Sequence, residues 1–296
     1  MWLVLVLIAT ILGGLAAVFA KQSNQLNGVK ATIIFWLFWY HVLTIIIVAV
    51  IRPEYIIGFS FIDLFKILPL ITIQTLGFIF SIKALHYAKA SLITPIQRVS
   101  VVLSIALGVL ILGEIVTLLQ LFISALLIGL VIYLGYISSN KSGKNENLKK
   151  GLIYAFLSLP FIGSTVVLYK PYLNFYVDPW IVLFYGAVNA LIFLSIYLTI
   201  KKDWSNITLK KVNAKWTLII ATLVDLGAGV FHRFSIIDGK VSVISVITTS
   251  SLVVTLLVSR VCIKDKLCLR ERLTFKQYLV IAGIIICVAV LSLLKV

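Results

Sequence analysis

The sequence is poor in acidic residues and in charge of any kind. Asp and Glu together number 10 against 26 Lys and Arg, and only 12% of the 296 residues are charged. Soluble domains carry about 25% charged residues, so the composition excludes an ordinary soluble domain. The net charge of +16 does not indicate nucleic-acid binding, because nucleic-acid-binding proteins carry their basic residues on a hydrophilic surface. Here short basic segments separate long apolar runs, which indicates an integral membrane protein.

The sequence also lacks the motifs of common catalytic and metal sites. Its three cysteines, Cys262, Cys268 and Cys287, show no metal-binding or redox spacing. There is no Walker A lysine motif, no HExxH and no GxSxG. We therefore expect no enzyme activity, no ATP hydrolysis by this chain, no bound metal and no cofactor.

Long apolar runs occupy most of the chain. A helix needs about 20 apolar residues to cross roughly 30 Å of hydrocarbon. Runs of this kind, bounded by charged or turn residues, predict ten membrane spans and leave no length for a soluble domain. The predicted spans are 2–20, 31–51, 67–85, 91–112, 118–138, 151–170, 180–200, 216–234, 241–262 and 276–294.

A basic polar linker, residues 139–150, divides the chain into a first half, 1–138, and a second half, 151–296. The halves share an internal repeat. Because each half has an odd number of spans, the two must enter the membrane in opposite directions, a plan that recurs in secondary transporters. The fold prediction is an all-α membrane protein of ten transmembrane helices, arranged as two inverted five-helix repeats. The matching segments are ILGGLAAVFAK (11–21) with PFIGSTVVLYK (160–170), KASLITPI (89–96) with KVSVISVI (240–247), and EIVTLLQ (114–120) with ERLTFKQ (271–277).

The end of the first half carries a more specific pattern. Residues 84–134 contain a small-residue start, a proline at Pro95, an LGE turn, T-x-x-Q and a small-residue helix. This stretch resembles the EamA-type repeat of the drug/metabolite transporter superfamily. The second half keeps a degraded copy: Glu271, Thr274 and Gln277 remain, but Lys264 and Asp265 replace the Leu and Gly. The resemblance implies a ten-helix carrier for small metabolites, with export favoured over import.

Charge asymmetry between the loops predicts orientation. With ten spans, one side of the membrane receives nineteen Lys and Arg residues and the other six, among them Lys66, Lys170 and Arg233. The positive-inside rule places the richer side, with linker 139–150, in the cytoplasm and both termini outside. Better-known proteins of the resembling family are thought to keep both termini inside. We give the charge count precedence and expect a multi-pass protein of the cell membrane.

Two ionisable groups are predicted deep inside spans, where charge is expensive and usually functional. Arg98, in the fourth span, is suited to anchoring a substrate's carboxylate or phosphate. Asp225, in the eighth, is suited to binding an amine or carrying a coupling proton. The structural alternative is that the two pair and hold the bundle together. Around them we expect a substrate site that includes Gln74, Gln97, Thr248, Thr249 and His41.

Other polar residues have structural interpretations. Glu114 and Glu271 precede the fifth and tenth spans, where a carboxylate complements the dipole of the helix it opens. Thr248, Thr249, Ser250 and Ser251 cannot all face one way, so one or more of these hydroxyls must bond to their own backbone. Small residues on the fifth span, Ala125 and Gly129, would suit a homodimer but do not establish one.

The sequence thus predicts a secondary transporter for a small polar or amphipathic metabolite, working by alternating access with a proton as the candidate coupling ion. Its partners are the lipid bilayer and a small-molecule substrate. The alternative is a non-catalytic membrane subunit, or a flippase component for a lipid-linked sugar, that requires a partner protein.

Overall fold

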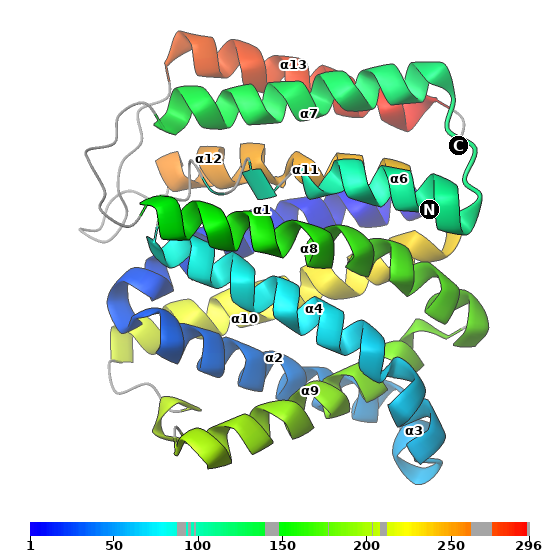
Figure 1. Ribbon diagram of the computed structural model, residues 1–296, viewed down its shortest axis with the longest axis vertical. Coiled ribbons are helices and arrows are strands. Elements are labelled where there is room, and N and C mark those ends of the chain that lie inside the picture. The colour runs from blue at the N-terminus through cyan, green and yellow to red at the C-terminus, as the bar shows by residue number, and fades with distance from the viewer. Residues whose placement is uncertain are drawn as a thin grey trace.

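The chain folds into apolar helices that lie roughly side by side in the computed structural model (Figure 1). The helices are α1 (Trp2–Asn27), α2 (Val29–Ile51), α3 (Glu54–Ile57), α4 (Phe61–Tyr87), α6 (Ser100–Leu112), α7 (Leu118–Ser139), α8 (Leu148–Tyr176), α9 (Pro179–Lys201), the short η1 (Trp204–Ile207), α10 (Val212–Asp238), α11 (Val241–Thr249), α12 (Ser251–Val261) and α13 (Phe275–Leu293). The structure describes residues 1–87, 93, 96–97, 99–139, 148–176, 178–202, 204–207, 212–261 and 274–294.

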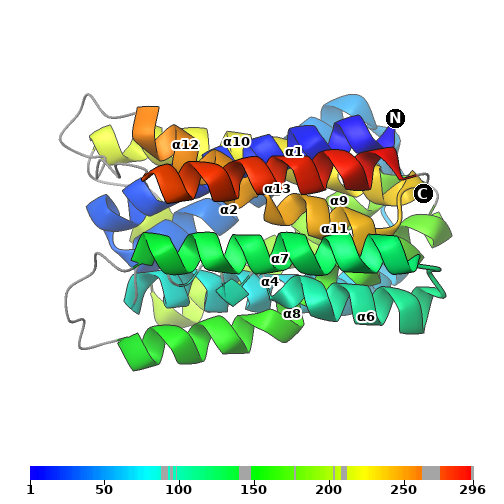
Figure 2. The same ribbon diagram turned by 90° about the horizontal axis from the view of Figure 1, so that it is seen from above.

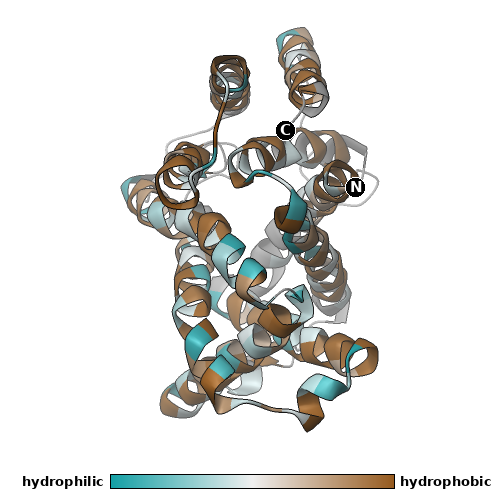
Figure 3. Ribbon diagram, turned by 90° about the vertical axis from the view of Figure 1, so that its right-hand side faces the viewer, coloured by the Kyte–Doolittle hydropathy of each residue, from teal (hydrophilic) through white to brown (hydrophobic). Residues whose placement is uncertain are grey.

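Six helices of the described part are long and apolar enough to cross a membrane: α1, α2, α4, α8, α9 and α10. Shorter apolar helices also lie in the bundle, at Ser100–Leu112, Leu118–Leu134, Val241–Thr255 and Phe275–Leu291. Seen along the helices, apolar residues cover most of the ribbon (Figure 3). The prediction of an all-helical multi-pass membrane protein is confirmed at this level.

Several helices extend beyond their predicted spans, and this corrects the charge count. α4 begins at Phe61 rather than 67, α8 continues to Tyr176, and α10 continues to Asp238. Lys66, Lys170 and Arg233, counted above as loop residues, therefore lie within helices. The apolar runs alone made these spans too short, because a helix with polar residues in its first or last turns can still be stabilised by tertiary contacts.

The predicted ninth span is divided at Ser250 into α11 and α12. The hydroxyls of Thr248, Thr249 and Ser250 donate to the carbonyls three residues earlier, at 2.9, 2.6 and 2.6 Å. The backbone N–H of Ser250 also bonds to the carbonyl three residues before it. Bonds of this spacing tighten a helix locally, so the run of hydroxyls marks the break, as the sequence argument about backbone bonding predicted.

A glycine brings α8 against α6. A Cβ atom added at Gly163 would lie 2.7 Å from the backbone oxygen of Ser100, closer than a carbon and an oxygen can approach. The Ser104 hydroxyl donates to the Gly163 carbonyl at 2.9 Å. Small residues allow backbones to approach in membrane bundles, and hydroxyls then bond across the contact.

The same contact recurs between α1 and α12. A Cβ atom at Gly14 would lie 2.7 Å from the backbone oxygen of Ser251, and the Thr255 hydroxyl donates to the Gly14 carbonyl at 3.1 Å. Gly14 and Gly163 are equivalent in the sequence repeat. In each contact, a helix that opens one half of the chain packs against a helix of the other half.

α7 and α13 pack together at one end of the long axis, opposite α2 and α9 (Figures 1 and 2). Leu127, Leu134, Ile284 and Leu291 are among the buried side chains between them. Both helices begin with the same capping arrangement, in which Thr and Gln three residues apart exchange hydrogen bonds at Thr117–Gln120 and Thr274–Gln277. The T-x-x-Q pattern of the sequence is thus a helix start in both halves.

The glycine contacts predict opposite effects for neighbouring substitutions. Gly163→Ala and Gly14→Ala should each lower stability by about 1–3 kcal/mol, because the added methyl forces two backbones apart. Gly13→Ala is the matched control: no atom of the described residues lies within 4 Å of its Cβ position, so the higher helix propensity of Ala should leave stability equal or higher. Thermal unfolding in detergent measures all three, and equal midpoints for Gly13→Ala and Gly14→Ala would contradict the contact.

Candidate functional site

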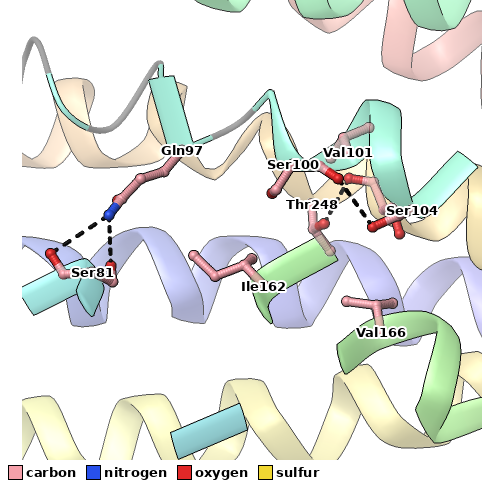
Figure 4. Close-up of a pocket in the computed structure, with 9 residues that line it drawn as sticks. Ser81, Gln97, Ser100, Val101, Ser104, Ile162, Val166 and Thr248 are labelled. Carbon is pink, nitrogen blue, oxygen red and sulfur yellow. Dashed lines mark hydrogen bonds between the residues drawn. The ribbon is translucent and has the colours of Figure 1, made fainter. Parts of the chain in front are cut away.

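A cavity of about 190 Å³ lies between the two halves of the chain. Its first-half wall comes from α4, α6 and the residues just before α6, and its second-half wall from α8 and α11 (Figure 4). The lining residues are Ser81, Gln97, Ser100, Val101, Ser104, Ile162, Val166, Ser245 and Thr248.

The cavity wall is rich in hydroxyl groups for a membrane bundle. Gln97 spans one end and donates to the Ser81 hydroxyl at 2.9 Å (Figure 4). The Ser245 hydroxyl is buried, with 2% of the residue exposed, and has no hydrogen-bond partner in the described part of the chain. Burying a hydroxyl without a partner is costly, so Ser245 offers a hydrogen bond to a polar group that enters the cavity.

A second polar centre surrounds Arg233 on α10. Its Nη2 atom donates to the Tyr169 hydroxyl at 2.8 Å, and its Nη1 atom lies 3.4 Å from the Tyr40 hydroxyl. The guanidinium carbon lies 4.8 Å from the centre of the Tyr169 ring, a cation–π geometry. Tyr169 in turn donates to the side-chain oxygen of Gln74. Four helices, α2, α4, α8 and α10, meet through these groups.

Asp225 lies eight residues before Arg233 on the same helix and accepts a hydrogen bond from the indole N–H of Trp36 at 3.1 Å. Between the two charges is Gly229. A Cβ atom there would lie 2.5 Å from the Tyr40 hydroxyl and 3.0 Å from Nη1 of Arg233. The missing side chain is therefore what allows Tyr40 and Arg233 to meet against α10.

The structure divides the predicted site residues among different places. Gln97 and Thr248 line the cavity, and Gln74 and Asp225 belong to the network around Arg233. His41 is buried on α2 with its ring edge-on to Tyr40 at 5.1 Å. Thr249 is fully buried, and its hydroxyl bonds to the Val246 carbonyl rather than facing the cavity. Arg98 lies outside the described residues.

Sequence reasoning missed Arg233. It was placed at the very end of the predicted eighth span, 216–234, and counted with the charges of the adjoining loop, whereas the apolar part of α10 continues to Asp238. Only 6% of Arg233 is exposed. The available signal was the apolar pair Ile236–Ile237 beyond it, which extends the span by another turn.

Glu114 holds the start of α11. Its carboxylate accepts from the backbone N–H groups of Val241 at 2.6 Å and Ser242 at 2.9 Å. Gly113 ends α6 in the left-handed conformation, with φ of 64°, and so turns the chain before Glu114. Glu114 does complement a helix dipole, as expected, but the helix is α11 of the other half and not α7, which the sequence had suggested. Glu271 lies outside the described residues.

Lys170 holds the preceding helix end. Its Nζ atom donates to the carbonyls of Ile236, Ile237 and Gly239 at 2.5, 2.6 and 3.2 Å. These carbonyls end α10, where a cation complements the helix dipole. We call the contacts of Lys170 and Glu114 with the α10–α11 turn the turn clamp. It ties α8 and the α6–α7 connection to that turn.

Further polar contacts join helices at the same end of the bundle, where both termini lie (Figures 1 and 2). Tyr55 donates to Asp178, whose other oxygen accepts from the N–H of Trp180 and caps α9. Burial and then this hydrogen bond raise the pKa of the Tyr55 phenol above its usual value. Arg52 lies 3.6 Å from the same carboxylate.

Comparison with known proteins decides the family. The sequence model of the EamA-like transporter family matches residues 1–136 and again residues 149–293. The chain belongs to the EamA-like transporter family. The two matches account for the recurrence of the same contacts in both halves, and they fit the drug/metabolite transporter superfamily. No curated protein matches the chain.

The EamA fold is also shared with solved structures, of which 27 chains match. One, described only as "Crystal structure of protein", has a TM-score of 0.72 at 12% identity and covers 98% of this chain and 96% of its own. At that identity the likeness shows the fold alone. Family membership identifies the chain as a membrane transporter of the drug/metabolite type, and the members of this family are not enzymes.

The turn clamp predicts a stability difference between two glutamates. Glu114→Ala should lower the free energy of unfolding by about 1–3 kcal/mol, because two partly buried N–H groups lose a charged acceptor. Glu54→Ala is the control: Glu54 pairs with Arg52 at 3.5 Å with both side chains about half exposed, and such pairs contribute at most about 1 kcal/mol. Thermal midpoints in detergent should separate the variants, and an unchanged Glu114→Ala midpoint would refute the clamp.

Proposed function

We propose that this EamA-family protein is a secondary active transporter of a small polar or amphipathic metabolite, working by alternating access. The six long and four shorter apolar helices then make ten crossings, as two inverted repeats. The cavity between the halves carries the proposal, because a binding site shared by two repeats can face either side of the membrane as they move.

The turn clamp keeps the cavity closed toward one face of the membrane in such a cycle. Lys170 and Glu114 tie the α10–α11 turn to the bundle end at which both termini lie. Thr248 and Ser245, on α11 itself, line the cavity. Opening the cavity toward that end requires α11 to move, and these hydrogen bonds must then break. The clamp is therefore the gate on that face.

The orientation follows from charge. The helix boundaries take in basic residues of both sides, Lys21, Lys83 and Lys149 as well as Lys66, Lys170 and Arg233, so both counts fall and the same side stays the richer. By the positive-inside rule the linker then lies in the cytoplasm of a cell-membrane protein, with the termini outside. The clamp closes the outer face, and export begins with substrate loading from the cytoplasm.

Thiol labelling tests alternating access. In a chain with Cys262, Cys268 and Cys287 replaced by Ala, Ser245→Cys places one thiol in the cavity wall. A small membrane-impermeant thiosulfonate should modify it from both faces in right-side-out and inside-out vesicles. Adding Glu114→Ala should raise the rate from the terminal face severalfold, because the gate is weakened. Glu54→Ala should leave that rate unchanged.

A second thiol determines on which side of the membrane the linker lies. Ser142→Cys, in the linker, should react only in inside-out vesicles if the linker is cytoplasmic, and reaction in right-side-out vesicles would reverse the orientation. Modification of the Ser245→Cys thiol from one face only, with or without the clamp, would contradict a carrier and favour the alternative of a membrane subunit that needs a partner.

Asp225 is the proposed carrier of a coupling proton, with support from its position near the middle of α10 and from its bond to Trp36. Protonation removes the charge that the indole N–H faces. Trp36 fluorescence should therefore change with pH in the wild type and stay flat in Asp225→Asn, which keeps an oxygen acceptor. Trp36→Phe is the control that identifies the signal, and an identical titration in Asp225→Asn would exclude this role.

A further inference from the structure

Arg233 has hydrogen-bonding capacity that the protein leaves unused. A guanidinium carries five N–H donors. Tyr40 and Tyr169 accept one hydrogen bond each, and the Nε atom is buried with no hydrogen-bond partner among the residues that the structure describes. The unused Nε–H therefore points to a ligand that accepts hydrogen bonds.

Arg233 also has no ion-pair partner among the described residues. Within the described part of the chain, no carboxylate approaches its guanidinium to within the 4 Å of an ion pair. Asp225, eight residues earlier on the same helix, bonds to Trp36; the Arg233 guanidinium reaches back to the Gly229 position, about one turn from Asp225, and forms no ion pair with it. Tyr40 and Tyr169 are neutral acceptors that orient the guanidinium without neutralising it. A buried cation inside a membrane is costly unless an anion accompanies it.

We propose that Arg233 binds an oxyanion group of the transported substrate, a carboxylate or phosphate that presents two oxygens to the guanidinium. The planar fork of Arg suits such a group. Tyr169 is a positioning residue, because its ring stacks on the guanidinium and its hydroxyl bonds to Nη2. This inference assigns a substrate class to the proposed transporter, but anion binding can be measured without transport.

Anion-dependent stabilisation tests the site. The full chain in an uncharged detergent is titrated with butyrate, benzoate, inorganic phosphate and phenyl phosphate at constant ionic strength, and with butyramide and benzamide as neutral analogues. A ligand that binds only the folded protein raises its melting temperature. At least one oxyanion should raise it saturably, and the amides should not.

Variants connect the effect to the guanidinium. Arg233→Gln should abolish the response, and Arg233→Lys should weaken the apparent affinity at least tenfold, since Lys keeps the charge but loses the fork. Tyr169→Phe keeps the ring and should fold normally, yet it should weaken binding severalfold. Arg52→Gln removes an Arg charge at the terminal face, where Arg52 pairs with Glu54 and Asp178, and should respond like the wild type.

The lipid composition of the membrane distinguishes a soluble anion from a lipid headgroup as the ligand. In nanodiscs of phosphatidylcholine or of phosphatidylglycerol, a soluble substrate should give the same response, whereas loss of the response in phosphatidylglycerol would mean that a lipid headgroup occupies the site. That loss would overturn the proposal. So would the absence of saturable stabilisation by every oxyanion, or a wild-type response that persists in both Arg233→Gln and Tyr169→Phe. Failure of the labelling experiment alone would leave this binding result standing.

Discussion

The close approach of two helix backbones at Gly163, repeated at Gly14, is the constraint on which the rest of the structure depends. Lipid is as apolar as a leucine side chain, so burial of apolar surface does little to drive one membrane helix against another. Direct contact and hydrogen bonds across the contact must do this instead. Ser104 and Thr255 provide them, each donating to the glycine carbonyl of the opposite helix. Because Ser100 and Ser104 also line the cavity, the contact at Gly163 fixes the position of the cavity wall.

Polar groups in this bundle follow two different designs. Those at the ends are fully engaged: Glu114 and Lys170 satisfy helix-terminal N–H and carbonyl groups that would otherwise have no partner. Those in the interior keep unused capacity, at the Ser245 hydroxyl and the Nε atom of Arg233. Unsatisfied buried groups cost free energy, so a folded protein retains them where a ligand repays the cost. The proposed oxyanion would satisfy the interior group at Arg233, and the proposed gating would release the contacts of Glu114 and Lys170.

The sequence predicted the helical class and the family because these depend on apolar runs and on motifs that recur in both halves. The repeat correctly paired Gly14 with Gly163, whose contacts are the same. It could not show that Glu114 caps α11, since capping by a distant residue is a tertiary contact that leaves no local pattern. Arg233 was missed because the predicted span ended next to it, before the apolar pair Ile236–Ile237; the contact of Lys170 with the end of α10 is a tertiary one that the sequence does not show. The sequence selected Gln97, Thr248 and Asp225 because they are polar residues within spans. That criterion cannot show which of them line the cavity and which belong to the network around Arg233.

Two adjacent residues of α8 connect the interior network with the gate. Tyr169 contacts the guanidinium of Arg233, and Lys170 holds the carbonyls at the end of α10. Both contacts are made to the same partner helix, so a displacement of α8 relative to α10 strains both at once. Tyr169 positions the guanidinium for the proposed oxyanion, and Lys170 is the next residue of the same helix. In the proposed transport cycle, recognition of the substrate and release of the α10–α11 turn would both act on the contact between α8 and α10.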